Sequence, residues 1–235
     1  MSEDGGSTEA AATSERKWAR RKQARPGELI AAALACFSER GFAATRLEDV
    51  AARAGVTKGT VYLYFPNKEE LFKAVIRESL LPNLEEALRG AAVAGEDPEA
   101  RLRRLVGFMV GKVLGSPLAV IPKLVIAEAS NFPELAKFYL DEVISRGRRY
   151  VVDAIREGIG RGQFREVDPE HAFFSLVAPI LLTAIWSKSF GPVDDHPLDG
   201  PAMIGDHLEL FFRGLAPGPA TAGSSRTREA RRSKR

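Results

Sequence analysis

Apolar residues along this chain recur every three or four positions, and almost no segment alternates apolar and polar residues. A spacing near the helical period of about 3.6 residues predicts helices, so the expected fold class is all-α. Proline in a first turn and glycine after a last turn mark helix boundaries, because proline lacks an N–H group and glycine tolerates a positive φ. These signals predict nine helices in succession.

The first three predicted helices are short and the later ones are longer. The first four are expected at residues 26–40, 45–55, 58–65 and 67–88. Pro82 should kink or break the fourth helix. The next four helices are expected to begin near Pro98, Pro117, Pro133 and Pro169, and the last to cover residues 199–214. Pro179 should bend the eighth helix.

Residues 45–65 (TRLEDVAARAGVTKGTVYLYF) have the pattern of two short helices joined by a tight turn. Thr45 and Glu48 have the spacing of a capping box. Gly55 can adopt the positive φ that the turn needs, and Thr57 is a suitable cap for the second helix. This pattern predicts a helix-turn-helix, whose second helix enters the major groove of DNA.

The second of these helices has an apolar face that should point outward. If Val61 points inward, a rotation of about 100° per residue directs Phe65 inward as well, whereas Gly59 and Leu63 point away. An outward leucine is unfavourable in water. A major groove offers it base edges and thymine methyl groups at the centre, with phosphates at the walls.

Residues 26–78 closely resemble the DNA-binding domain of the TetR family of bacterial transcriptional regulators. The resemblance rests on the segment RPGELIAAALACFSERGFAATRLEDVAARAGVTKGTVYLYFPNKEELFKAVI, and within it on G-F-x-x-T, A-x-x-A-G-V-[ST]-x-G and K-x-x-L-F. It covers roughly a quarter of the chain. The remaining helices match the family in number and length, but their sequence is not diagnostic.

The resemblance implies a DNA-binding surface on the turn and the second helix of the motif. Leu63 stands at a position that varies in the family, so it is expected to set sequence preference. Lys68 matches a lysine that contacts phosphate. The residues expected to contact DNA are Thr45, Arg46, Thr57, Lys58, Gly59, Thr60, Tyr62, Leu63, Tyr64 and Lys68.

Basic residues gather near both ends of the chain. The net charge is +3, and residues 16–25 and 226–235 each hold six basic residues. Such arms often touch nucleic acid, and solvated tails are the alternative. The expected organisation is a disordered basic arm, a helix-turn-helix domain, a helical ligand-binding and dimerisation domain and a disordered basic tail, at residues 1–25, 26–78, 79–215 and 216–235.

The resemblance also implies that the C-terminal domain binds a small molecule and forms a homodimer. Residues 173–186 (FFSLVAPILLTAIW) are apolar nearly all round, which suits a helix packed on its own core and on a partner copy. The alternative is a core helix in a monomer. Glu128 is either an acid that recognises the ligand or a paired structural charge. The candidate ligand contacts are Phe108, Met109, Glu128, Asn131, Phe132, Phe138, Tyr139 and Trp186.

Several classes of protein find no support in the sequence. The single cysteine, Cys36, excludes a disulfide framework and is expected in the core, and the three histidines lack metal-ligand spacing. We therefore expect no metal and no cofactor. No signal peptide is evident, and the longest uncharged apolar stretch, 172–187, is shorter than the roughly 20 residues of a membrane span. No catalytic constellation stands out, so an enzyme is not expected.

The expected function is that of a cytoplasmic regulator of transcription. A repressor would bind a palindromic operator as a dimer and leave it when a small, hydrophobic ligand binds, because the two sites are thermodynamically coupled. The alternatives are an activator that needs its ligand, a packaging protein of low sequence specificity, and an enzyme that uses the motif only for location.

Overall fold

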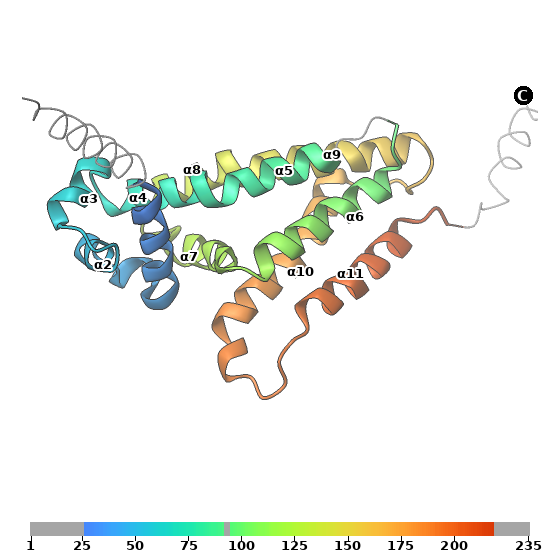
Figure 1. The fold of residues 1–235 in the computed structure, drawn as a ribbon. Helices are drawn as coiled ribbons and strands as arrows, with labels where there is room; N and C mark the ends of the chain where they lie inside the picture. Colours follow the sequence, from blue (N-terminus) through green and yellow to red (C-terminus); the bar gives the residue numbers. More distant parts are fainter. Residues whose placement is uncertain (1–25, 92–94, 219–235) are drawn as a thin grey trace, which may run out of the picture. The chain divides into compact units, whose positions relative to one another are not determined.

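The computed structural model describes residues 26–91 and 95–218, which form helices and turns without a strand (Figure 1). The all-α prediction is confirmed for this part of the chain, and the nine expected helices follow one another in it. The basic arm at 1–25 and residues 219–235 of the basic tail lie outside the described residues. The first helix covers residues 26–44.

The other helices come in the predicted order. The two helices of the motif are α2 (Leu47–Arg53) and α3 (Lys58–Tyr64). The fourth expected helix consists of α4 (Lys68–Val75), the π-helical turn η1 (Ile76–Leu80) and α5 (Leu81–Ala91), the fifth of α6 (Pro98–Met109) and the π-helical turn η2 (Val110–Leu114), and the sixth of the 3-10 turn η3 (Pro117–Ala119) and α7 (Val120–Glu128). The seventh consists of α8 (Pro133–Tyr139), the π-helical turn η4 (Leu140–Ile144) and α9 (Ser145–Gly160), and it is followed by α10 (Pro169–Ser189), the 3-10 turn η5 (Gly191–Val193) and α11 (Gly200–Leu215).

The fourth helix does not break at Pro82. It runs without interruption from α4 through η1 into α5, and the N–H of Leu81 bonds to the carbonyl of Ile76, five residues back. A π-helical turn adds one residue to the turn, so the helix rearranges its hydrogen bonds just before the proline and continues. Helix α10 likewise continues through Pro179, where the Thr183 hydroxyl donates to the Pro179 carbonyl at 2.8 Å.

The helices form two compact units. Among the described residues, the first contains 26–84 and 113–143, and the second contains 85–91, 95–112 and 144–218. The helix-turn-helix and helices α7 and α8 therefore belong to the same compact unit. The domain boundary expected at residue 78 stays a prediction.

Aromatic rings form the core of the first unit. The Phe37 ring lies 5.5 Å from that of Phe42 and 5.2 Å from that of Phe72. Phe132, just before α8, meets Phe42 edge-on at 5.0 Å. Leu29, Ala33, Cys36 and Phe37 of the first helix are all buried, so the core position expected for Cys36 is confirmed.

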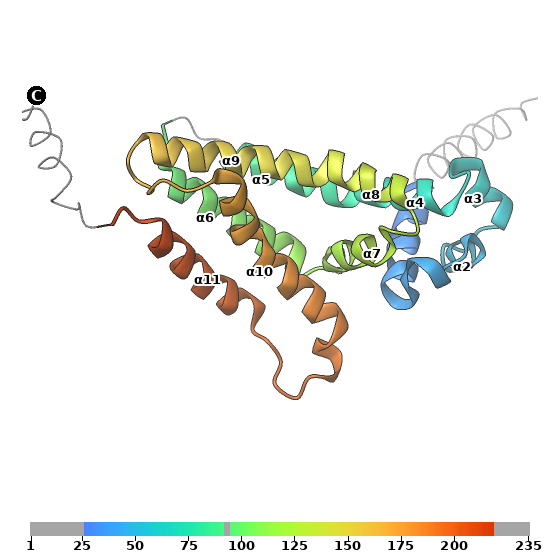
Figure 2. The same cartoon turned by 180° about the vertical axis from the view of Figure 1, so that it is seen from behind.

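The second unit is built around α9 and α10. Helix α9 packs against α6 and α10, and α10 packs against α11, with which it is joined by the loop seen in both views (Figures 1 and 2). On α9, Gly158 lies directly against the Phe164 ring. Arg101 of α6 donates to the Tyr150 hydroxyl at 3.4 Å and pairs with Glu157, so polar contacts also join α6 to α9.

Candidate nucleic-acid interface

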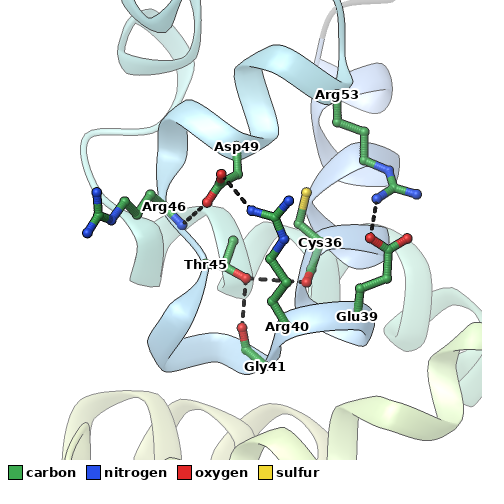
Figure 3. Close-up of polar contacts among 8 residues, drawn as sticks. All are labelled: Cys36, Glu39, Arg40, Gly41, Thr45, Arg46, Asp49 and Arg53. Carbon is green, nitrogen blue, oxygen red and sulfur yellow. Dashed lines mark hydrogen bonds and ion pairs between the residues drawn. The ribbon is translucent and has the colours of Figure 1, made fainter.

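The cap of helix α2 lies one residue later than the sequence predicted. Its cap is Arg46, whose backbone N–H donates to the Asp49 carboxylate at 2.9 Å (Figure 3). The predicted capping box of Thr45 and Glu48 is therefore wrong. The Thr45 hydroxyl instead donates to the Gly41 carbonyl at 2.7 Å, because Gly41 ends a stretch of the first helix with a positive φ of 81° and leaves its carbonyl in reach.

Two ion pairs hold α2 on the first helix. Arg40 pairs with Asp49 at 2.7 Å, and Arg53 pairs with Glu39 at 2.6 Å (Figure 3). The Arg46 backbone N–H and the Arg40 guanidinium hold the pKa of Asp49 below its usual range. The positive charge of Arg53, at the end of α2, is thus already paired with a carboxylate.

The tight turn forms as the sequence predicted. Gly55 has a φ of 66°, and the N–H of Val56 bonds to the Ala51 carbonyl at 2.9 Å. Thr57 caps α3, since its hydroxyl accepts from the N–H of Thr60 at 3.3 Å. A substituted residue at 55 would be strained by the positive φ.

Helix α3 presents the face that the sequence predicted. Val61 and Phe65 are buried, whereas Tyr62 is 46% exposed and Leu63 is 74% exposed. Gly59 is exposed, and Thr60 and Tyr64 are half-buried at the sides. An apolar leucine that projects from a short helix between a tyrosine and an open glycine is suited to the centre of a major groove.

Lys58 and Glu48 form an ion pair across the motif. The Lys58 ammonium holds the pKa of Glu48 below its usual range, and Glu48 raises the pKa of Lys58 in turn. The same ammonium lies 5.5 Å from the centre of the Tyr62 ring. Both partners of the pair are exposed, so a phosphate can compete for Lys58 in the way that it competes for other surface pairs.

Lys68 is engaged inside the protein. Its ammonium donates to the carbonyls of Phe42, at 2.7 Å, and Ala43, at 2.9 Å, and lies 4.6 Å from the centre of the Phe42 ring. Burial lowers the pKa of Lys68, and the charge of Glu128 opposes this shift. Lys68 therefore closes the end of the first helix as well as beginning α4.

One predicted contact residue is not on the surface. Thr45 as a whole residue is 1% exposed, so neither its side chain nor its backbone is available to DNA. Its hydroxyl is held within the first unit because the end of the first helix needs a donor. The predicted residues that the structure places on the surface or partly so are Arg46, Thr57, Lys58, Gly59, Thr60, Tyr62, Leu63, Tyr64 and Lys68.

Three of the candidate ligand residues lie together at the end of α7. The Glu128 carboxylate is buried and accepts from the Asn131 amide at 3.1 Å. Phe132 follows them and packs on Phe42, whose carbonyl receives the Lys68 ammonium. Sequence reasoning assigned no role to Phe42, although it stands in the G-F-x-x-T motif, because the partners of its ring come from distant parts of the chain.

The other candidates are more scattered. Phe108 and Met109 are half-buried in the second unit, and Trp186 lies near the end of α10, where its indole N–H donates to Asp194 at 3.2 Å. Phe138 in the first unit lies under the Arg77 guanidinium at 4.6 Å. Burial raises the pKa of the Tyr139 phenol.

Comparison with known families decides what this helix-turn-helix belongs to. Residues 29–75 match the family described as "Bacterial regulatory proteins, tetR family", and residues 100–200 match "AefR-like transcriptional repressor, C-terminal domain". The chain belongs to the TetR family of bacterial transcriptional regulators. As a TetR-family member it is a regulator of transcription and not an enzyme. Both its helix-turn-helix segment and its C-terminal segment match models of regulators.

Relatives of this TetR-family chain match it over most of their length. It is 29% identical over 197 residues to the HTH-type transcriptional repressor KstR2 of Rhodococcus jostii, and the aligned region covers 83% of this chain and 93% of that protein. It is 29% identical over 204 residues to the fatty acid metabolism regulator protein of Bacillus subtilis, covering 83% of this chain and 98% of that protein. The solved structure of the ketosteroid transcriptional regulator KstR2 of Mycobacterium tuberculosis matches with a TM-score of 0.65 and 25% identity, covering 83% of this chain and 96% of that one.

Two further properties of this TetR-family chain bear on its site. Within residues 26–91 and 95–218, no group of three or more His, Cys, Asp or Glu residues is arranged to hold a metal ion. Helix α10, with 21 residues and a mean hydropathy of 1.4, is long and apolar enough to cross a membrane by length and composition alone. Helix α10 is longer than the uncharged apolar stretch predicted at residues 172–187, because the helix also includes polar residues at both ends.

Proposed function

We propose that this protein is a repressor that binds a palindromic operator as a homodimer and releases it when a small hydrophobic ligand binds. The observation that carries the proposal is the exposed face of α3, on which Leu63 projects between Tyr62 and Gly59. Leu63 reads thymine methyl groups or base edges in the major groove. Arg46, Thr57, Lys58, Thr60 and Tyr64 meet the phosphates and outer bases, and Lys68 supports the surface from within.

Dimerisation is supported by an apolar face that the single chain leaves open. Phe174, Leu182 and Trp186 are exposed along α10, and Leu210 of α11 is 71% exposed. An apolar patch of this kind, on two neighbouring helices, is typical of a protein–protein interface. A partner copy explains the hydropathy of α10 in a cytoplasmic protein, and a dimer reads two half-sites of a palindrome.

The ligand class is supported by what the relatives regulate. One relative is named a fatty acid metabolism regulator and another a ketosteroid regulator. Both point to a largely hydrocarbon ligand, in agreement with the aromatic candidates Phe108, Phe132 and Trp186. Glu128 is held by Asn131 and acts on Lys68, which favours a structural role over ligand recognition.

Release requires the ligand site to act on the DNA-binding surface. The contact of Phe132 with Phe42, and of Lys68 with the Phe42 carbonyl, joins the end of α7 to the end of the first helix inside one compact unit. A ligand that shifts α7 therefore displaces the first helix, on which α2 is held by its two ion pairs. The coupling must be reciprocal, so operator DNA lowers the affinity for the ligand.

The test is a titration of the preformed complex. The protein is bound to the DNA upstream of its own gene, the protected region is mapped, and long-chain fatty acids, their coenzyme A esters and 3-ketosteroids are added in turn. A palindromic footprint that one of these compounds abolishes supports the repressor. A footprint that appears only when the compound is added identifies a ligand-dependent binder instead, and protection without sequence preference identifies a packaging protein.

A further inference from the structure

The second unit has a surface hollow of about 210 Å³ between α9 and the start of α10. Its charged lining residues are Arg148, Arg149, Arg156, Asp153 and Glu170. Arg148 donates to Glu170 at 2.6 Å, and Arg156 lies 3.4 Å from Asp153. Arg149 is exposed and forms no ion pair with any residue that the structure describes. The hollow, which we call the Arg149 hollow, thus carries one uncompensated guanidinium.

A loop with the opposite character joins α10 to α11. This acidic loop, residues 190–199 (FGPVDDHPLD), holds Val193, which is 81% exposed, directly before Asp194 and Asp195. Asp194 is used within the loop, where it accepts from the Trp186 indole and from the N–H of His196. Asp195 is exposed and forms no ion pair with the described residues. An exposed apolar tip beside an uncompensated carboxylate is complementary to a surface that offers an apolar rim and a guanidinium.

The exposed face of α10 connects the two features. Phe174, Ala178, Leu182 and Trp186 follow one another at intervals of four residues, and all four are exposed. At one end, the Phe174 ring lies 6.0 Å from the Arg148 guanidinium of the hollow. At the other end, the Trp186 ring packs on Phe190 of the acidic loop at 4.9 Å. Hollow and loop therefore stand at opposite ends of one apolar stripe.

We propose that the acidic loop of each copy docks into the Arg149 hollow of the other copy. The twofold symmetry of the dimer then gives two identical contacts, which stabilise it. This inference rests on the proposed dimer. In a twofold interface the same patch is used by both copies, so the α10 stripes pack on each other. If they run antiparallel, the hollow end of one stripe meets the loop end of the other.

The charges select the antiparallel arrangement. It places the Asp195 carboxylate beside the partner copy's Arg149 guanidinium, a pair that can form two parallel hydrogen bonds. It also opposes the dipoles of the two α10 helices. A parallel arrangement would instead bring Arg149 against Arg149 and Asp195 against Asp195, and like charges across an interface are unfavourable. In the antiparallel arrangement, Val193 covers the apolar rim of the partner copy's hollow, where Val152 lies.

A charge exchange between copies tests the contact. One copy carries Arg149→Glu and a differently tagged copy carries Asp195→Arg. Each homodimer then holds two like-charge pairs, whereas the mixed dimer holds one native and one inverted pair. Native mass spectrometry of the mixture should show the mixed dimer rising from the statistical half to about four fifths or more. A contact within one chain cannot produce this preference.

The controls separate the contact from the dimer itself. Arg89→Glu, an exposed change of the same charge on α5, should give a statistical mixture with Asp195→Arg. Leu182→Glu should yield monomers if the α10 stripe forms the dimer. A statistical mixture of the Arg149→Glu and Asp195→Arg copies, with monomeric Leu182→Glu, overturns the docking and leaves the dimer intact. A dimeric Leu182→Glu overturns the dimer on which the docking rests.

Discussion

The Lys68 side chain has a role in the fold that the sequence did not predict. The family resemblance assigns it to phosphate, whereas its ammonium closes the first helix through the carbonyls of Phe42 and Ala43. The Phe42 carbonyl also accepts from the N–H of Thr45 at 3.3 Å, so the ammonium adds a charged donor to the carbonyls at the end of this helix. Such a contact joins residues 26 positions apart, and no local pattern predicts it.

We predict that Lys68→Met destabilises the protein by about 1–2 kcal/mol, because the methionine keeps the apolar stem over Phe42 but removes the donor. Urea unfolding at neutral pH measures the change. Lys58→Met is the matched control, since Lys58 lies on the surface and pairs only with the exposed Glu48, and its urea midpoint should stay close to that of the parent protein. Equal midpoints for both variants and the parent would show that Lys68 serves phosphate alone.

Gly158 gives a second prediction at this scale. A Cβ atom there would overlap with the Phe164 ring, so Gly158→Ala forces the buried ring to move. We expect a loss of about 1–3 kcal/mol in the free energy of unfolding. Gly160→Ala, in the same helix with open space around the position, should be neutral or slightly stabilising, because alanine favours a helix. An undiminished stability of Gly158→Ala would contradict this packing.

At the scale of elements, the sequence predicted the number and order of the helices better than their caps and their π-helical turns. Proline and glycine signals located every helix in the described part, because these residues act locally. The cap of α2 was misplaced by one residue, because the Thr45 hydroxyl donates to the Gly41 carbonyl of the first helix and does not cap α2. The π-helical turns η1, η2 and η4 were not predicted, because they depend on how each long helix packs along its whole length.

The start of α10 supplies a prediction on pH. Asp168 caps this helix by accepting from the N–H groups of Glu170, at 2.8 Å, and His171, at 3.3 Å, and these bonds hold the pKa of Asp168 below its ordinary value. Because the folded-state pKa is the lower one, the stabilisation is complete above the ordinary value of about 3.9 and is lost as the pH falls through the folded-state pKa.

Asp168→Asn should retain the cap without its charge. Between pH 6 and pH 3 the parent protein should therefore lose more of its urea stability than Asp168→Asn does. Thermal melts at both pH values give an independent reading. If the two proteins lose stability in parallel, the Asp168 carboxylate has no special role at the start of α10.

At the scale of the whole molecule, the sequence could predict which face of α3 points outward but not how the motif is connected to the rest of the chain. The directions of Val61, Leu63 and Phe65 follow from helical geometry alone, and burial confirms them. The meeting of Phe132 with Phe42, and the membership of α7 and α8 in the unit of the helix-turn-helix, depend on contacts between distant segments. No alternation of apolar and polar residues encodes such contacts, so they emerge only from the folded chain.

The central claim is that the outward face of α3 reads a specific DNA sequence. Fluorescence anisotropy on the DNA upstream of the protein's own gene, at fixed near-physiological salt and with scrambled DNA as competitor, tests it most directly. We predict that Leu63→Ala lowers the preference for this DNA over scrambled DNA by about tenfold, in line with the loss of one good base contact. Ile126→Ala, an exposed apolar change on α7, should leave the preference unchanged. Equal preferences for the parent protein and Leu63→Ala would contradict the claim.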